Sequence, residues 1–317
     1  MTVVLARLLP YAAGLLMSAC PSVVAIASGV PKPEQLAPGV YVVTGAAENA
    51  APANHGVVGN AGILIGATGV ILVDTGTSAR QARRLLADVR ELSAKPVVLA
   101  INTHQNPAFV FGNGTLRALG VPILAHRDTD ALIGERCMRC LKQLRLALGE
   151  REMEGTDVVR PTRTIEQSTS ITAGGRTIDI LYYGVTSAPG SIAVYDRASG
   201  VLFGGGMVSM DRIPDVKDAD IGQWRAALRS LRAIGAARIV PGEGTVCAPS
   251  RLAELDRYLE LLPQAVQAAY EQRASLAEAA TAAPVAAYRG WALYDSIHRR
   301  NVEQLYLRLE KDFLNTP

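Results

Sequence analysis

Histidine is scarce in this chain, which has only four among its 317 residues. Imidazole nitrogen, thiolate sulfur and carboxylate oxygen are the groups that hold zinc in proteins, usually three or four to an ion. Four histidines supply few imidazoles for a histidine-rich site that binds two metal ions. The four cysteines are also too few for a four-cysteine zinc site once the leader described below, which contains Cys20, is removed.

The chain also has little net charge and few Phe and Trp residues. The formal net charge is +3, and the chain has four Phe and two Trp. A charge this small and evenly distributed, with no basic run interleaved with aromatics, gives no basis for nucleic-acid binding. The length suffices for a large hydrophobic core, and no linker divides the chain into independent domains.

Residues 1–27 have the pattern of a secretory signal peptide. Arg7 supplies a positive charge, Leu8 to Met17 form an apolar stretch, and Ala25-Ile26-Ala27 is a small-any-small cleavage signal. The stretch is too short for a membrane span, so we expect cleavage after Ala27 and a periplasmic or secreted protein. The alternative is a lipoprotein signal, in which Cys20 carries the lipid and anchors the mature protein.

The rest of the chain alternates between strand and helix patterns. Short apolar runs bounded by turn residues predict strands at 39–43, 61–65, 70–73 and 97–101, and again at 164–169, 170–173, 177–183, 192–196, 201–203 and 238–240. Apolar residues at helical spacing predict helices at 78–92, 221–234, 252–280 and 288–313, with Ser78 as the first N-cap. This alternation favours one α/β domain over residues 28–317.

A short polar loop follows the predicted strand at 97–101, and such a rigid strand end suits a functional site. It reads Thr103-His104-Gln105-Asn106-Pro107-Ala108-Phe109. Four other short motifs occur along the chain, at Gly59 to Ile65, Val70 to Gly76, Val201 to Gly205 and Val240 to Gly242. In their order along the chain, these motifs and the loop make the segment from Gln35 to about Leu309 resemble the metallo-β-lactamase superfamily. The resemblance implies a four-layer αββα sandwich and, in typical members, zinc-dependent hydrolysis.

The resemblance can be carried residue by residue to the positions where typical members bind zinc. His104 matches the first histidine of the His-any-His-any-Asp-His motif. The other positions carry residues that bind zinc poorly or not at all, namely Asn106, Ala108 and Phe109 in the motif, Ser187 in a later turn, Gly206 for the bridging aspartate and Glu243 for the last histidine. Only His104 is unchanged, and only Glu243 has a side chain that could substitute.

We therefore interpret the chain as a metal-free pseudoenzyme, because a hydroxide nucleophile at neutral pH needs a metal to lower the pKa of bound water. The alternative is a reduced site in which His104 and Glu243 hold one zinc ion, with Asn106 or water. The resemblance places Asp74 behind the metal loop, where we expect it to cap backbone amides. The former site is expected to be a less charged, more apolar cavity lined by Asn106, Phe109, Ser187, Ser191, Glu243 and Gly204 to Gly206.

The remaining histidines and Ser187 offer little catalytic chemistry. His126 ends a buried apolar run and is expected to be structural, whereas His55 and His298 are expected to be solvated. Ser187 with His104 as its base would form a nucleophilic pair. Acyl transfer is not favoured, because Ser187 lies in no nucleophile-elbow motif and no carboxylate that would orient the histidine is identifiable.

Cys137 and Cys140 are spaced as Cys-any-any-Cys within a charged helical segment. In an oxidising compartment a local disulfide is the simplest interpretation, with Cys247 left unpaired or buried. Leu141 stands where a haem-attachment motif has histidine, and a thioredoxin-like motif would open a helix, so redox catalysis is less favoured. Cys-any-any-Cys-Leu after the metal loop resembles the quinoprotein relay system zinc metallohydrolase branch, which is associated with periplasmic pyrroloquinoline quinone (PQQ) alcohol dehydrogenases.

Three classes of function follow from these observations. The first, which we favour, is an exported binding or accessory protein whose partner is a small molecule or a periplasmic protein, with no cofactor. The second is a hydrolase that uses one zinc ion or none. The third is a thiol redox protein.

Overall fold

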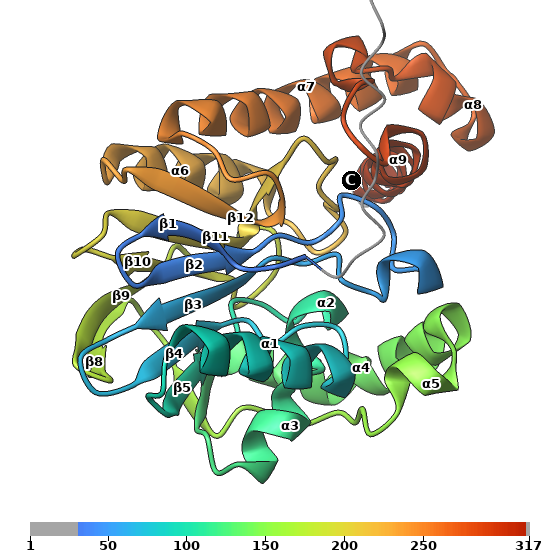
Figure 1. The fold of residues 1–317 in the computed structure, drawn as a ribbon. Helices are drawn as coiled ribbons and strands as arrows, with labels where there is room; N and C mark the ends of the chain where they lie inside the picture. The colour runs from blue at the N-terminus through green and yellow to red at the C-terminus, as the bar shows by residue number, and fades with distance from the viewer. Residues whose placement is uncertain (1–30, 315–317) are drawn as a thin grey trace, which may run out of the picture.

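Two β-sheets packed face to face form the centre of the computed structural model, which describes residues 31–314 (Figure 1). Helices cover the outer face of each sheet, so the layers follow the order helix, sheet, sheet, helix. The predicted four-layer α/β sandwich is confirmed. The predicted leader, with Cys20 and the cleavage position after Ala27, lies outside the described residues.

The first sheet has seven strands that follow the order of the chain. Each strand from β1 to β4 pairs antiparallel with the next. Each strand from β4 to β7 pairs parallel with the next. Both faces of the central parallel strands are covered, which explains why β4 and β5 are continuous apolar runs. The strands are β1 Glu34–Ala37, β2 Val40–Val43, β3 Ala61–Ile65, β4 Val70–Val73, β5 Val97–Ile101, β6 Ile123–His126 and β7 Arg163–Ile165.

The second sheet has five strands in the order β12, β11, β10, β9, β8. Its strands pair antiparallel from β8 to β11, and β12 returns parallel to β11. Two of its strands are longer than predicted, since β11 continues beyond 201–203 to Met210, and β12 continues beyond 238–240 to include Glu243. The strands are β8 Thr169–Ala173, β9 Arg176–Tyr182, β10 Ile192–Asp196, β11 Val201–Met210 and β12 Arg238–Gly244.

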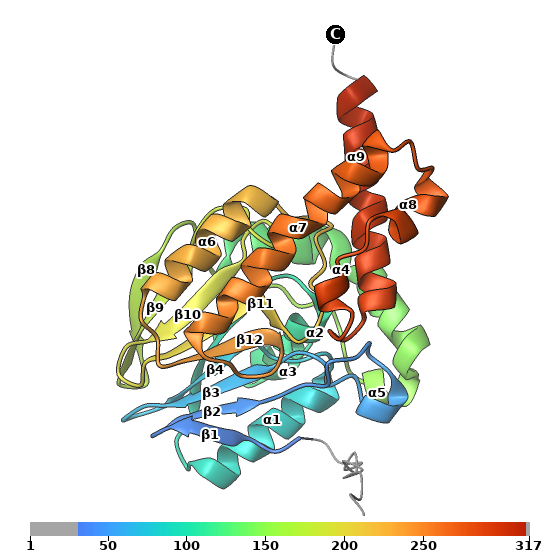
Figure 2. The same cartoon turned by 90° about the horizontal axis from the view of Figure 1, so that it is seen from above.

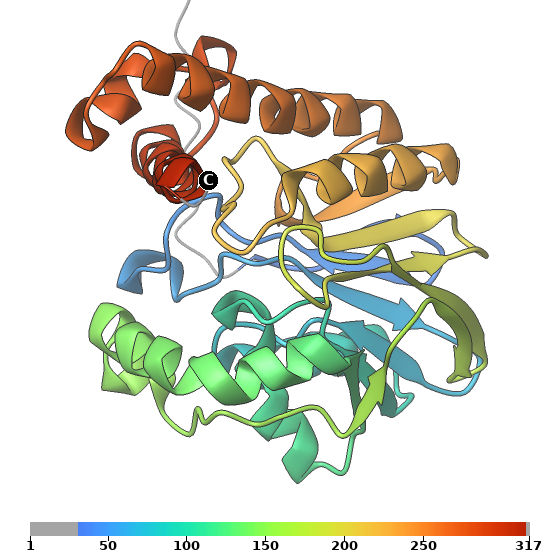
Figure 3. The ribbon, with the colours of Figure 1, turned by 180° about the vertical axis from the view of Figure 1, so that it is seen from behind.

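The helices divide between the two outer faces (Figures 1 and 3). On the side of the first sheet lie α1 Ala79–Leu92, α2 Pro107–Val110, α3 Asn113–Ala118, α4 Arg127–Leu148 and α5 Glu150–Met153. On the side of the second sheet lie α6 Ile221–Ala233, α7 Leu252–Glu271, α8 Leu276–Ala282 and α9 Arg299–Leu314. Figure 2 shows α8 and α9 at one end of the sandwich. Within the described residues, no helix has the length and apolar character that spanning a membrane requires.

Apolar side chains from both sheets meet in a shared core. Val73 and Ile101 of the first sheet belong to the same buried cluster as Ile180, Phe203 and Val240 of the second. Burial of such side chains contributes about 1.5–3 kcal/mol each, so this layer holds the two sheets together. The loop that follows β5 and the middle of β11 are therefore held in fixed relative positions.

Three further element boundaries differ from the sequence prediction. The strand predicted at 164–169 is two strands, because β7 pairs with β6 in the first sheet whereas β8 begins the second. The helix predicted at 252–280 breaks near Arg273, whose φ of 60° is left-handed. The last helix is preceded by a π-helical turn at Tyr294–His298. Local apolar spacing does not reveal these breaks, since they depend on distant packing partners.

The histidines outside the polar loop have structural surroundings. His126 caps α4 by accepting from the Asp128 N–H at 3.1 Å, as expected of a structural residue. His55 is half exposed beside Glu152. The prediction that His298 is solvated was wrong, because its ring is buried between the Tyr258 hydroxyl at 3.1 Å and the Ala283 carbonyl at 3.0 Å. It packs where the C-terminal helices meet α7.

Candidate functional site

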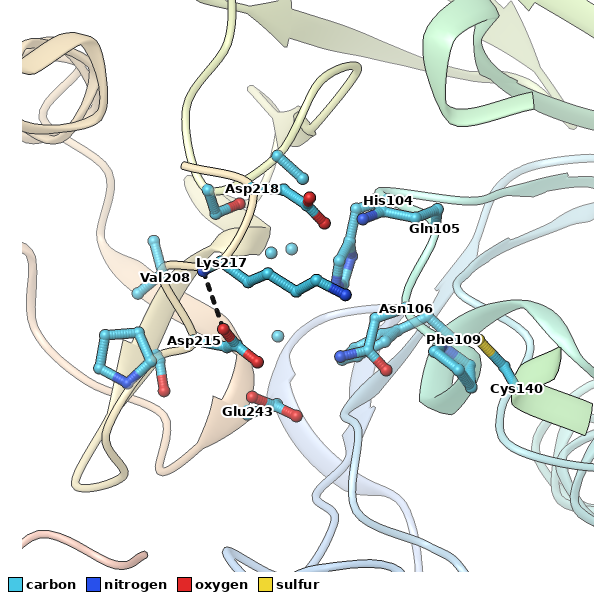
Figure 4. A pocket seen from close by; sticks show the side chains of 18 of the residues that line it. His104, Gln105, Asn106, Phe109, Cys140, Val208, Asp215, Lys217, Asp218 and Glu243 are labelled. Carbon is cyan, nitrogen blue, oxygen red and sulfur yellow. Dashed lines mark hydrogen bonds between the residues drawn. The ribbon is translucent and has the colours of Figure 1, made fainter. Parts of the chain in front are cut away.

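A cavity of about 300 Å³ lies where the loop after β5 faces β11 and β12. Its wall takes in residues 104–107 and 109, three residues of α4, the turn at 187–188, parts of β11 and β12, and the loop between β11 and α6. Figure 4 shows the polar side chains that point into it. Of the residues that the sequence placed in a cleft, the cavity includes His104, Asn106, Phe109, Ser187, Gly205, Gly206 and Glu243, whereas Ala108, Ser191 and Gly204 lie outside its wall.

His104 is held by a chain of hydrogen bonds that begins at Asp74. The Thr103 hydroxyl donates to Asp74 Oδ2 at 2.8 Å and lies 3.0 Å from His104 Nδ1. Asp74 also accepts from the Thr103 backbone N–H at 2.8 Å, which is the amide capping expected from the sequence. No carboxylate that orients His104 was identifiable from the sequence, because Asp74 reaches the histidine only through the Thr103 hydroxyl.

Burial controls the ionisation of both ends of this chain. It raises the pKa of Asp74 to about 8, although the two hydrogen bonds from Thr103 oppose the shift. It lowers the pKa of His104 to about 3. His104 is therefore neutral at physiological pH and does not supply a cation to the cavity.

The ring of His104 is enclosed on two sides. The Phe109 ring lies 4.2 Å from it, centroid to centroid, at an interplanar angle of 51°. On the other side is Gly206, where a Cβ atom would lie 2.6 Å from His104 Cδ2. The histidine thus occupies the space that a side chain at position 206 would need. The bridging aspartate of typical superfamily members has no room here while His104 keeps this position.

Glu243 forms an ion pair with Arg212, a residue that no sequence motif indicated. The Arg212 Nη1 atom contacts Glu243 Oε2, and both side chains are largely buried, with exposed fractions of 9% and 16%. Burial raises the pKa of Glu243, and Arg212 counteracts the shift. Arg212 Nε is itself buried without a hydrogen-bond partner in the described residues. The carboxylate at the last ligand position is therefore already neutralised by a guanidinium group.

Asn106 and Ser187 have local hydrogen-bond partners. Asn106 caps α2, because its Oδ1 atom accepts from the Ala108 N–H at 3.0 Å. Its Nδ2 group remains to donate into the cavity. The Ser187 hydroxyl lies 3.1 Å from Ser191 Oγ. Within the described residues, Ser187 makes no hydrogen bond to His104, which a nucleophilic serine would need.

The side chains present do not fit a zinc ion. Within residues 31–314, no group of three or more His, Cys, Asp or Glu side chains is arranged to hold a metal. Glu243 is engaged by Arg212, and His104, with Nδ1 beside the Thr103 hydroxyl, offers a single imidazole nitrogen where zinc needs three or four ligands. A divalent cation beside Glu243 would also be repelled by the guanidinium group, and this repulsion is strong where water is largely excluded.

The loop between β11 and α6 gives the cavity a charge that the sequence analysis did not expect. Asp215, Lys217 and Asp218 line the wall, as does Arg136 of α4, so the expectation of a less charged cavity was wrong. The charged run Asp215-Val216-Lys217-Asp218, which follows a strand, could have indicated a charged loop from the sequence. Without the fold, however, nothing placed this loop opposite His104.

The C-terminal helix fixes this charged loop in place. Asn301 of α9 donates to the Pro214 carbonyl at 2.7 Å and accepts from the Val216 N–H at 3.1 Å. Arg300 pairs with Asp215 at 2.9 Å. The end of the chain therefore helps to build the cavity wall, although α9 lies outside the two sheets.

The three cysteines within residues 31–314, Cys137, Cys140 and Cys247, are free thiols in the structure. Cys137 is buried in α4 with its Sγ atom 3.8 Å from the Gln105 carbonyl oxygen, and Cys140 is half-buried at the cavity wall. The predicted disulfide between them is not formed here and stays a prediction for the exported protein. Cys247 is buried in a different cluster, and this burial raises its pKa to about 11.

A two-sheet sandwich with its cavity beside a histidine loop is the architecture of a metallo-hydrolase fold. The profile of the Metallo-beta-lactamase superfamily matches residues 56–243, more than half of the chain. The chain belongs to this superfamily.

Solved structures of similar fold include a metallo-beta-lactamase from Pontibacter korlensis, with a TM-score of 0.60, 21% identity, and coverage of 73% of this chain and 99% of that one. A metallo-beta-lactamase from Hirschia baltica has a TM-score of 0.59, 22% identity, and coverage of 73% and 98%. A linear primary-alkylsulfatase from Pseudomonas sp. (strain ATCC 19151) is 27% identical over 56% of this chain. The match spans only 39% of that relative's length.

Proposed function

We propose that this chain is a metal-free member of the superfamily that binds a small molecule in its cavity and performs no zinc-dependent hydrolysis. The ion pair between Arg212 and Glu243 carries the proposal. It leaves a fixed positive charge, instead of a metal, beside the only carboxylate that matches a ligand position. The enclosure of His104 by Phe109 and Gly206 supports the same conclusion.

Zinc content tests the proposal directly. After incubation with excess zinc and desalting, the purified protein is expected to retain less than about 0.1 equivalent, because two side chains, one of them paired with Arg212, bind zinc weakly. Elemental analysis by mass spectrometry measures this. The competing one-zinc hydrolase would retain about one equivalent and would lose it in the His104→Ala variant. That result would overturn the metal-free assignment.

The ligand that the cavity suits best is a small anion with an apolar part. Each acidic side chain of the wall already pairs with a base, since Asp218 contacts Arg136 at 2.8 Å, Asp215 contacts Arg300 and Glu243 contacts Arg212. Lys217 forms no ion pair with the other described residues, and in Figure 4 its side chain extends toward His104 and Asn106.

Neutral donors and apolar groups complete such a site. The Asn106 amide and the Ser187 hydroxyl can donate to an anion held by Lys217, and charge-assisted hydrogen bonds of this kind are the stronger ones. Val208, Pro214 and Trp224 supply an apolar surface in the same wall. A few convergent polar groups in an apolar cavity are typical of small-molecule sites.

Alkyl sulfates are suitable probes, because the name of the curated relative refers to linear primary alkyl sulfates. We expect hexyl sulfate to bind in calorimetric titration and Lys217→Gln to weaken binding by about tenfold through loss of one charged contact. Lys142→Gln, an exposed lysine of α4 outside the cavity wall, is the matched control and should bind as the parent does. Equal binding of hexyl sulfate and uncharged hexanol would contradict an anion site.

We also propose that the protein is exported as one domain over residues 28–317 and serves a periplasmic partner, in keeping with its resemblance to the quinoprotein relay branch. A role beside PQQ-dependent alcohol oxidation is the corresponding biological context. Mass analysis of the mature protein tests export, with an N-terminus at Ser28 expected. A lipidated Cys20 would instead identify a membrane-anchored lipoprotein.

A further inference from the structure

Two thiols on one face of α4 border the cavity. Cys137 and Cys140 are three positions apart in the helix, so their side chains are neighbours. Both belong to the cavity wall, with Cys137 the more deeply buried and Cys140 half-buried. A molecule in the cavity can therefore reach Cys140 before it reaches Cys137.

The surroundings make the two thiols unequal. The pKa of Cys140 is lowered, chiefly by its interaction with the neighbouring Cys137, and burial opposes this shift. The Cys140 backbone N–H and the positive charges of Lys217 and Arg139 lower it further. The pKa of Cys137 is raised by its interaction with Cys140, in which Cys137 keeps its proton, and also by burial. Cys140 is the more exposed thiol of the pair and the one whose pKa is lowered, so it more readily supplies the thiolate, which is the nucleophilic form of cysteine.

We propose that Cys137 and Cys140 form a thiol–disulfide exchange site at the cavity wall, with Cys140 as the attacking sulfur and Cys137 as the resolving one. The substrate class is a small disulfide that enters the cavity. The Cys140 thiolate attacks one sulfur of this disulfide, which forms a mixed disulfide and releases the other half as a thiolate. Cys137 then loses its proton to solvent and attacks Cys140 Sγ, which releases the second thiolate. The protein gives up two electrons and the Cys137 proton, and the two released thiolates take up protons from solvent, so the substrate disulfide is reduced to two thiols.

Helix geometry favours a reversible reaction. Side chains three positions apart in an α-helix have Cβ atoms about 5–6 Å apart, whereas a disulfide needs about 3.5–4.5 Å. Closing the bond must therefore distort the middle of α4, and strained disulfides are the more easily reduced. Oxidation would also break the contact between Cys137 Sγ and the Gln105 carbonyl, which adjoins His104. The disulfide predicted from the sequence is then the oxidised state of this site, and the structure holds the reduced state.

Trapping the mixed disulfide tests the assignment. The reduced full chain is exposed to bis(2-hydroxyethyl) disulfide and mapped by peptide mass spectrometry. We expect the parent protein to form the Cys137–Cys140 disulfide, Cys137→Ser to retain one adduct on Cys140, and Cys140→Ser to leave Cys137 unmodified. An adduct on Cys137 in Cys140→Ser that forms as fast as the adduct on Cys140 would overturn the assigned roles.

Cys247 and Lys142 supply internal controls. Cys140 is expected to react with iodoacetamide at pH 7 at least about a hundredfold faster than the buried Cys247. Lys217→Gln should slow Cys140 alkylation by about two- to threefold at pH 6.5, and Lys142→Gln should not. These rates report on the thiolate in the folded protein even if Cys137→Ser is poorly stable. Alkylation of Cys140 and Cys247 at equal rates would contradict an exchange site.

Discussion

Replacing Arg212 by methionine is expected to lower the free energy of unfolding by about 3–5 kcal/mol, because it leaves Glu243 buried without its counter-charge. The folded protein would respond by protonating Glu243, whose pKa burial already raises. A carboxyl whose folded-state pKa lies above its unfolded value contributes fully at low pH and loses that contribution as pH rises. The loss in free energy of unfolding caused by Arg212→Met should therefore be small near pH 5 and grow toward pH 8. Urea unfolding at both pH values measures it.

The double variant Arg212→Met/Glu243→Gln separates the lost ion pair from lost packing. It removes both charges and keeps similar volumes, so its stability is expected to recover most of the deficit. It should also lack the pH dependence of the single variant, because glutamine does not titrate. If both variants are equally unstable at every pH, the ion pair does not govern this side of the cavity.

Acid is expected to destabilise the protein through His104. The unfolded chain gains a proton near pH 6.5, whereas burial lowers the pKa of His104 in the folded protein to about 3. Between these values the unfolded state binds the proton and the folded state does not, so stability falls as pH falls. The loss from this residue amounts to about 2 kcal/mol at pH 5.

The variant His104→Gln isolates this contribution, because its side chain does not titrate and can still bond to Thr103. The difference in unfolding free energy between parent and variant should shift by about 2 kcal/mol in favour of the variant from pH 7.5 to pH 5. Asp74 and Glu243, whose raised pKa values act in the opposite direction, are present in both proteins and largely cancel. A pH-independent difference, or a His104 proton signal that titrates near 6.5, would contradict the burial argument.

The sequence by itself determined the architecture and the position of the histidine loop. Apolar runs such as Val70–Val73 and the N-cap Ser78 act locally, and they predicted β4 and α1 close to their observed bounds. The order of short motifs predicted the superfamily. The substitutions at Asn106, Phe109 and Gly206 indicated a site without metal before any geometry was known.

Only the tertiary structure decided which charged side chains surround that site. Arg212 and Lys217 lie far from His104 in sequence, and their loop faces it because α9 fixes the backbone at Pro214 and Val216. Asp74 is 29 positions from Thr103, and strand pairing between β4 and β5 brings the two together. Phe109 of α2 and Gly206 of β11 contribute to the burial that lowers the pKa of His104. Charge pairing and desolvation depend on distances between remote segments, so neither can be obtained from local sequence patterns.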